Sequence, residues 1–300
     1  MKSRIVLSVI IIAVLAAVPV TASKVNRLDL EASHIVVGEV AAVEGYFGLN
    51  ENGDRLIFSR VTLKAEKWLK GRAESLVSFS VEGGVVGDLG LMVSESPVFE
   101  KGEKVKAYLK RGPKGFDLLD KQEAGQKAKK PRPPATCCST FAHWPTTTVP
   151  YLLNTVNNDG NLDTQVQGAV RDGLMAWNVI NWRYDGGTTT TRVAYNGMNE
   201  IFFAAASSGN AIAVTYTWYS TSTKLISEFD MKFYDKAWLF FASGCQGGFN
   251  IDNITTHESG HAIGLNHNSC TSSIMYPYAS YCASNTPSNA DGACVLALYK

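Results

Sequence analysis

The chain has 300 residues, of which 45% are hydrophobic, and its formal net charge at pH 7 is +1. Residues 24–134 carry nineteen basic against sixteen acidic side chains, whereas residues 135–300 carry seven against eleven. Neither part has the dense basic stripe of a nucleic-acid-binding protein, so the composition disfavours nucleic acid as a partner. A chain of this length is expected to form two domains.

The N-terminus is typical of an export signal. Lys2 and Arg4 precede an apolar run over residues 5–20, and small residues follow it. We expect cleavage after Ala22, which makes residues 1–22 a signal peptide and the product secreted and extracellular. The alternative is an uncleaved anchor, but the run is shorter than the roughly 20 residues that span a bilayer. No membrane association is expected after cleavage.

Residues 23–120 are expected to form a small antiparallel β domain. Four segments alternate apolar and polar residues, which is typical of strands, and glycine-rich connections such as Gly83-Gly84 separate them. The domain has no cysteine and no catalytic cluster, and it serves either as a propeptide or as a permanent accessory domain. The expected strands cover 34–44, 56–68, 75–82 and 103–110.

Residues 121–135 are expected to form a linker between the two domains. Their sequence, KQEAGQKAKKPRPPA, combines lysines and prolines that cannot build a packed core and favour an extended path. Its basic residues suit a trypsin-like processing enzyme, although a plain spacer explains the same composition.

Residues 136–300 are expected to form an α+β domain. Val166, Val170, Leu174 and Trp177 recur at helical spacing, and Thr164 with Gln167 resembles a capping box at the start of that helix. Further along the chain, the expected strands are 200–205, 211–219 and 226–234, and the expected helices are 250–263 and 289–299.

All six cysteines lie in this second domain, and an even number on an exported chain indicates disulfide bonds. Cys270 and Cys282 flank a short loop and are the first pair that we expect to be joined. Cys137 and Cys138 are neighbours, so each is expected to bond to a distant partner, because disulfide geometry requires Cα atoms roughly 5.5 Å apart.

The sequence HESGHAIGLNH contains three of the chain's five histidines. Residues four apart lie on one face of a helix, so His257 and His261 direct both imidazoles at one point. Gly264 can adopt positive φ, and a turn there returns His267 to the same point. Three such ligands with one open position are typical of catalytic zinc. Glu258 follows the first ligand and leans over the water at the open position.

These residues resemble the extended zinc motif HExxHxxGxxH of the metzincin metallopeptidases. In that family a methionine-containing turn follows the motif, and Ser273-Ile274-Met275-Tyr276-Pro277 matches it. The Met-Tyr-Pro form looks most like the matrixin branch. The resemblance extends over about residues 140–300 and implies that Met275 lies beneath the metal.

The resemblance implies a zinc-dependent endopeptidase with one catalytic Zn²⁺ held by His257, His261 and His267. Zinc lowers the pKa of its bound water towards ~7 and polarises the substrate carbonyl. Glu258 is then the general base, which takes the proton of that water and passes it to the departing amine.

The expected partner is a protein or peptide substrate, and the enzyme is expected to be a monomer. The substrate is expected to extend along the edge strand 211–219 and to pair with it through its backbone. Backbone pairing holds any peptide, so side-chain specificity is expected to come from a pocket near Pro277 and Tyr278.

The chain departs from the family pattern in several ways. Pro277 stands where related branches have a tyrosine ligand, and only His34 and His143 remain for a second, structural zinc, so neither feature is expected. The cysteine switch PRCGxPD of the family is also missing. The family's calcium sites cannot be assigned to residues, although Glu228, Asp230 and Asp235 are carboxylates in a suitable region.

Two other functions are open on the sequence alone. One is a non-catalytic, zinc-containing extracellular binding protein on the same scaffold, but the presence of Glu258 argues against it because a structural zinc site needs no base. The other is that residues 24–120 act as a ligand-binding β module and the peptidase is accessory to it.

Overall fold

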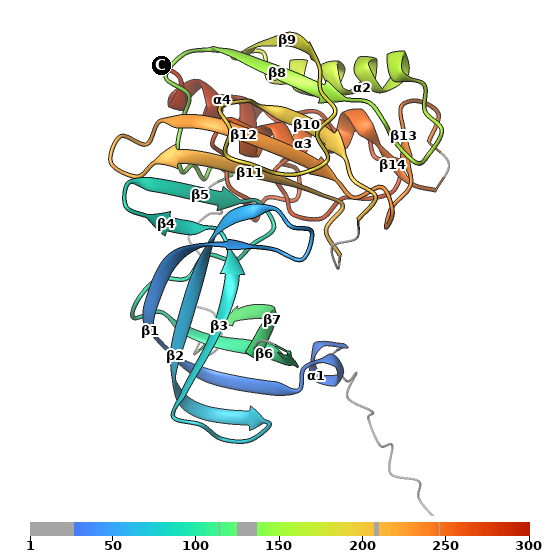
Figure 1. Cartoon of the computed structure of the whole chain (residues 1–300). Coiled ribbons are helices and arrows are strands. Elements are labelled where there is room, and N and C mark those ends of the chain that lie inside the picture. Colours follow the sequence, from blue (N-terminus) through green and yellow to red (C-terminus); the bar gives the residue numbers. More distant parts are fainter. Residues whose placement is uncertain (1–26, 114, 125–136, 207–209, 246) are drawn as a thin grey trace, which may run out of the picture.

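The computed structural model describes residues 27–113, 115–124, 137–206, 210–245 and 247–300. The expected signal peptide 1–22 and most of the expected linker 121–135 lie outside these residues. No helix in the described ranges is long and apolar enough to span a membrane. Two bodies stacked one above the other make up the molecule, and the β4–β5 hairpin lies between them (Figure 1).

The N-terminal body is a closed five-stranded barrel that follows a short helix, α1 (Arg27–Glu31). Apolar side chains at alternate strand positions fill its interior, among them Val36, Val61, Leu63 and Val105, which are fully buried. Around the barrel the order is β1 (His34–Leu49), β2 (Arg55–Lys70), β3 (Leu76–Glu82), β7 (Gly115–Glu123) and β6 (Lys104–Gly112).

The barrel corrects three expectations for this half. First, it is not purely antiparallel, because β3 and β7 pair in parallel. Second, Lys121 to Glu123, expected in the linker, belong to β7. Their backbone pairs with β6, and Lys121 is held by Glu103 at 2.7 Å. Third, two short strands of this half, β4 (Gly84–Val86) and β5 (Leu89–Val93), lie outside the barrel.

The C-terminal body is built on a seven-stranded mixed sheet, which agrees with the expected α+β class. Within it β11 is antiparallel to both of its neighbours, and β8, β9, β10 and β12 run parallel. Only β4 and β5 come from the N-terminal half. The strand order is β4, β5, β11 (Ala213–Ser220), β12 (Ile226–Phe233), β10 (Glu200–Phe203), β8 (Thr148–Asn154) and β9 (Asn181–Gly187). Two short strands, β13 (Phe240–Phe241) and β14 (Phe249–Asn250), form a separate pair.

Three helices accompany this sheet: α2 (Asp163–Met175), α3 (Ile251–Ala262) and α4 (Asn289–Leu298). The expected capping box at Thr164 and Gln167 is wrong. The N-cap is Leu162, whose backbone N–H donates to the Gln165 side chain at 3.1 Å, so the helix begins earlier in the chain. Trp177 lies just beyond α2, where its indole N–H donates to the carbonyl of Thr256 in α3 at 2.8 Å.

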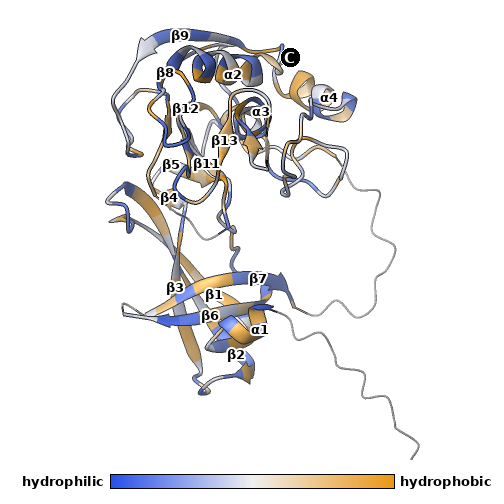
Figure 2. Ribbon diagram, turned by 90° about the vertical axis from the view of Figure 1, so that its right-hand side faces the viewer, coloured by the Kyte–Doolittle hydropathy of each residue, from blue (hydrophilic) through white to orange (hydrophobic). Residues whose placement is uncertain are grey.

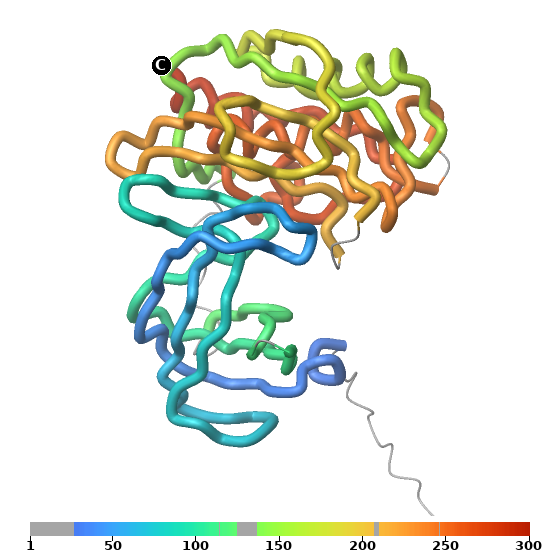
Figure 3. The backbone as a smooth tube through the Cα atoms, viewed as in Figure 1, coloured from blue at the N-terminus to red at the C-terminus, as the bar shows by residue number. Residues whose placement is uncertain are grey.

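Both faces of the large sheet are covered by apolar side chains. The face towards α2 and α3 carries Phe229, Met231 and Phe233, all fully buried. The opposite face carries Phe202, Val214, Tyr216 and Trp218, and these pack against Leu56 and Ile57 of β2 and against Leu91 and Val93 of β5. The tip of the β1–β2 hairpin therefore covers the sheet from outside (Figure 3). By contrast, β9 at the sheet's far edge is largely hydrophilic (Figure 2).

Three disulfides cross-link the C-terminal body: Cys137–Cys270, Cys138–Cys294 and Cys245–Cys282. The expectation of disulfides is confirmed, as is the expectation that the two neighbouring cysteines have distant partners. The expected bond between Cys270 and Cys282 is wrong. The N–H of Cys282 donates to the carbonyl of Gly248 at 2.9 Å, which brings its loop to Cys245 instead.

Candidate metal centre and active site

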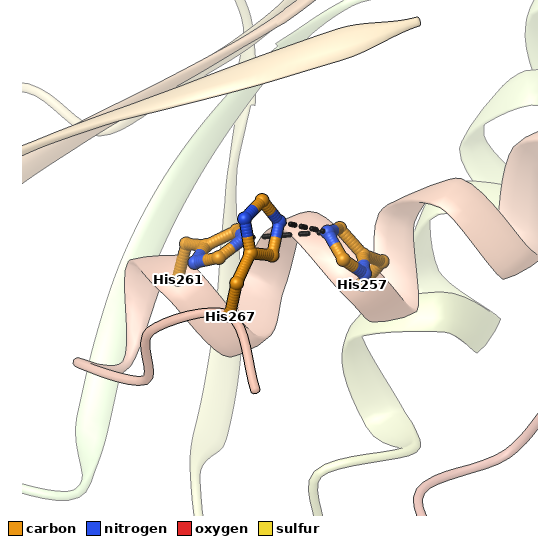
Figure 4. Close-up of side chains that lie close together, drawn as sticks. All are labelled: His257, His261 and His267. Carbon is orange, nitrogen blue, oxygen red and sulfur yellow. Dashed lines mark hydrogen bonds between the residues drawn. The ribbon is translucent and has the colours of Figure 1, made fainter. Parts of the chain in front are cut away.

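Helix α3 holds the first two histidines of the motif. It is buried over most of its length, and its backbone carbonyls at Glu258 and His261 accept hydrogen bonds from the Thr215 and Thr217 hydroxyls of β11, at 3.1 and 3.3 Å. These two bonds orient the helix against the sheet. His257 and His261 are one turn apart and present both rings to the same side (Figure 4).

Gly264 makes the turn that brings the third histidine back. Its φ is +99°, and a Cβ atom there would lie 1.8 Å from the carbonyl oxygen of Ala142. Only glycine satisfies both the backbone angle and this close approach. The chain reverses after α3, and His267 lies over the other two rings.

The three rings converge on one point through their Nε2 atoms. The Nε2 atoms of His257 and His267 are 3.1 Å apart, and those of His261 and His257 are 3.2 Å apart (Figure 4). Nδ1 of His257 contacts the carbonyl of Ile274 at 2.6 Å, and Nδ1 of His261 contacts that of Leu265 at 2.8 Å. Carbonyls only accept, so both Nδ1 atoms must carry the proton. The Nε2 atoms of His257 and His261 are then unprotonated, and their lone pairs face each other.

Two lone pairs at this distance repel each other unless a cation lies between them. Tetrahedral zinc with nitrogen ligands at 2.0–2.1 Å separates those nitrogens by about 3.3 Å, close to the distances found here. Burial lowers the pKa of His257, and it lowers the pKa of His261 well below its usual value. The pKa of His267 is lowered to about 3, mainly by burial and secondly by the charge of His257. All three are therefore neutral, the form that binds metal. The donor set fits zinc.

Glu258 lies beside this cluster and is almost completely buried. Its Oε2 accepts hydrogen bonds from the hydroxyls of Thr215 at 2.7 Å and Ser94 at 3.3 Å. Burial raises the pKa of Glu258 to about 7, and these hydrogen bonds act in the opposite direction. A carboxyl group with a pKa near neutrality can take up a proton and release it again.

Met275 is 1% exposed and lies against α3 at Gly260. A Cβ atom at Gly260 would be 2.3 Å from its sulfur, so the helix and the methionine turn meet without space for a larger residue. Asp291 of α4 fixes this turn by accepting from the Ser273 hydroxyl at 2.5 Å and from the Ile274 N–H at 3.1 Å. Sequence analysis missed Asp291, although the pattern Ser288-x-x-Asp291 marks it as part of a helix cap.

A cavity of about 100 Å³ opens next to His257 and Glu258. Pro277 and Tyr278 both line it, together with residues 211–213 and Ile254, and Tyr278 is otherwise 77% exposed. A larger cavity of about 190 Å³ lies between the barrel and β5, but it contains none of the three histidines.

Residues 143–300 match the model of the matrixin family. The chain belongs to the matrixin family. The match includes the three histidines, Glu258 and Met275, and it leaves the barrel and β4–β5 outside. None of the curated proteins matches the chain.

In this matrixin β11 is not the edge of the sheet, which corrects the expected edge strand 211–219. β5 pairs with it antiparallel, from Leu89 opposite Ser220 to Val93 opposite Tyr216. Sequence analysis missed this strand because Gly87 and Gly90 made the segment look like a connection.

A carboxylate from the segment after β5 also lies at the matrixin's candidate metal centre. Oε1 of Glu95 is 3.5 Å from Nε2 of His267. A carboxylate oxygen of Glu95 also lies within 4.8 Å of the atoms of His257 and Glu258 that could bind a metal. Partial burial, followed by the charge of Glu258, raises the pKa of Glu95 to about 7. No local sequence signal points to Glu95, because it lies far from the histidines along the chain.

The carboxylates considered for calcium have other partners. Glu228 accepts from the N–H groups of Asn196 and Gly197, at 2.9 and 2.6 Å. Asp230 likewise accepts from two backbone N–H groups, and Asp235 accepts from the backbone and side chain of Asn158. In the described ranges these three carboxylates do not join a cluster of three or more His, Cys, Asp or Glu ligand atoms.

Proposed function

We propose that this matrixin is a secreted zinc-dependent endopeptidase. The observation that carries the proposal is the convergence of three neutral histidines, two of which present facing lone pairs at 3.2 Å, beside a buried carboxyl group. The family match supports a metallopeptidase, and the three disulfides are consistent with an extracellular location.

His257, His261 and His267 would hold the metal. Zinc in such a site polarises the substrate carbonyl and lowers the pKa of the water that it binds. Glu258 takes the proton from the attacking water and gives it to the departing amine. Thr215 keeps the Glu258 carboxylate in place through its 2.7 Å hydrogen bond. Burial of the base excludes bulk water, so proton exchange takes place with the reacting groups.

The substrates we propose are proteins or peptides. A peptide can pair with the backbone of β11 whatever its sequence, provided that β5 leaves that edge. The cavity of about 100 Å³ between residues 211–213 and Pro277-Tyr278 is then the pocket for one side chain of the substrate.

The proposal is tested with the full chain after its linker has been cut, because the basic residues there allow limited digestion with trypsin. His261→Ala should lose bound zinc, since two ligands remain. Glu258→Ala should keep about one zinc per chain and should lose casein hydrolysis by ~10²–10⁴-fold. His143→Ala, which removes a histidine outside the site, is the matched control for both measurements.

Two results would contradict the proposal. One is full zinc retention in His261→Ala, shown by elemental analysis. The other is hydrolysis by Glu258→Ala within tenfold of wild type, which would mean that another base operates. A zinc-loaded wild type that hydrolyses no protein after linker cleavage and removal of the N-terminal body would favour the zinc-containing binding protein.

A further inference from the structure

β5 occupies the strand position that a substrate of the proposed peptidase needs. The ladder between β5 and β11 continues beyond the strand end to the active site, where the N–H of Ser94 donates to the carbonyl of Thr215 at 3.0 Å. The N–H of Thr215 in turn donates to the Ser94 hydroxyl at 3.0 Å. That hydroxyl also contacts Glu258, so β5 and Ser94 engage both the substrate strand and the base.

The chain does not continue through the cleft after Ser94. It turns back, since the N–H of Ser96 donates to the carbonyl of Val93 at 3.1 Å, and Pro97 follows. The Ser96 hydroxyl donates to the carbonyl of Glu82 at 2.6 Å and ties the returning chain to the barrel. Glu95 therefore lies at the tip of a tight turn, and the segment does not pass across the metal centre as a cleavable peptide would.

The tip of this turn places a carboxylate at the metal centre. Oε1 of Glu95 is 3.5 Å from Nε2 of His267, close to the roughly 3.3 Å expected between two ligands of one tetrahedral zinc. Carboxylate oxygen is a common zinc ligand. A catalytic site has three protein ligands and an open position, whereas four protein ligands close the site.

Contacts far from the metal hold the turn in this place. Asp88, at the β4–β5 turn, accepts hydrogen bonds from the Ser220 and Thr221 hydroxyls at 2.7 and 2.9 Å. It also accepts from the N–H of Ser222 at 2.8 Å. Leu91 and Val93 are buried in the apolar cluster that also contains Trp218. The hairpin is thus anchored at its turn and along β5.

We propose that Glu95 is a fourth protein ligand of the metal, and that the intact chain is a latent form whose N-terminal half fills the substrate strand and the open coordination position. This inference rests on the proposed function, because it requires a metal at the three histidines. It also gives residues 23–135 a role: they contain the inhibitor of the peptidase in the same chain.

The first experiment measures access to the metal. The intact full chain is loaded with Co²⁺ in place of Zn²⁺, and acetohydroxamate is titrated while the visible spectrum is followed. In the wild type acetohydroxamate must displace the carboxylate, whereas in Glu95→Gln the position is open. We expect Glu95→Gln to bind acetohydroxamate at least tenfold more tightly, and Glu100→Gln, an exposed glutamate on the same segment, to behave as the wild type.

A second measurement uses the same intact variants with a fluorogenic peptide. Loss of the bond from Glu95 to the metal should let β5 leave β11 more often, so Glu95→Gln should hydrolyse the peptide at least tenfold faster than the wild type. The amide is isosteric with the carboxylate, and circular dichroism and the zinc content check that the variant is folded and loaded.

The outcomes separate the two proposals. Equal acetohydroxamate affinity in wild type and Glu95→Gln, with cobalt bound in both, would overturn the role of Glu95 alone. Equal hydrolysis rates in the two intact proteins would overturn the claim that the bond from Glu95 to the metal holds β5 on β11. Failure of the wild type to bind one cobalt per chain would instead contradict the proposed function, because the three histidines would then hold no metal.

Discussion

Two glycines without functional groups determine whether the metal centre can form. Gly264 allows the reversal that brings His267 to the other two ligands, and its α-carbon faces the Ala142 carbonyl with no room for a methyl group. Gly260 allows α3 to lie directly on the sulfur of Met275. The ligands themselves are therefore only part of what the site requires.

Gly264→Ala is expected to destabilise the protein by about 2–5 kcal/mol. Positive φ costs a non-glycine residue about 1–2 kcal/mol, and the collision with the Ala142 carbonyl adds about 1–3 kcal/mol. Gly160→Ala is the matched control, because Gly160 has φ +73° but nothing within 4 Å of the added Cβ atom. Urea unfolding should show a loss of only about 1–2 kcal/mol for the control. Equal losses would mean that the close approach at Gly264 relaxes at no cost.

Residues of the site differ in how far sequence could identify them. His257, Glu258, His261 and His267 lie within eleven residues, so helical spacing and one glycine turn bring them together without knowledge of the fold. Ser94 contacts Glu258 across a sequence separation of 164 residues, and Glu95 reaches the site from the same segment. Such a contact depends on how two halves of the chain pack, which no local pattern encodes.

Among the elements, the helices of the site were predicted closely and the short strands were not. The helix expected over 250–263 is α3 (Ile251–Ala262), since its apolar and motif residues follow helical spacing. β4 and β5 are three and five residues long, contain glycine, and gain their stability from pairing with β11 rather than from their own pattern. β11 was consequently expected at the edge of the sheet.

The β1–β2 hairpin is joined to the matrixin sheet by a buried ion pair between Asp54 and Lys232, with side chains 0% and 1% exposed and a separation of 2.8 Å. Asp54 also accepts from the N–H of Val193 at 3.1 Å. Lys232→Met should cost about 3–5 kcal/mol because it leaves a buried carboxylate without its cation. Adding Asp54→Asn to this variant should recover part of that loss, since the carboxylate that lost its cation is then replaced by a neutral amide.

This pair is tested by a double-mutant cycle in urea, with Asp54→Asn, Lys232→Met and the double variant. The double variant is expected to lose about 0.5–3 kcal/mol less than the sum of the two single losses, as is usual for residues in direct contact. Additive losses would show that the two charges do not stabilise the contact between hairpin and sheet.

At the scale of the whole molecule, two disulfides close nearly the same long loop. Cys137–Cys270 and Cys138–Cys294 start at neighbouring residues and span 133 and 156 residues. On a chain-entropy account, a single long disulfide stabilises the folded state by about 5 kcal/mol. Once it has formed, the second disulfide closes a loop of only about 25 residues and adds about 3.5 kcal/mol of stability. Each therefore partly substitutes for the other.

Removing both disulfides should consequently cost about 1.5 kcal/mol more than the sum of the two single removals. The variants Cys137→Ala with Cys270→Ala, Cys138→Ala with Cys294→Ala, and all four substitutions together test this in urea unfolding. Strictly additive losses would mean that the two bonds stabilise independent parts of the structure.

All six cysteines lie between residues 137 and 294, so no disulfide can join the barrel to the matrixin body. Before the linker is cut, the barrel meets the sheet as part of one chain, at an effective concentration that is typically millimolar for a short connection. After the cut, the same contacts must hold two separate molecules together, and their occupancy falls with dilution. Proteolysis of the linker would therefore not switch the peptidase on by itself. Activation would follow from the volume into which the cut product is released, so a dilute extracellular fluid would free the active site and a crowded secretory compartment would keep it closed.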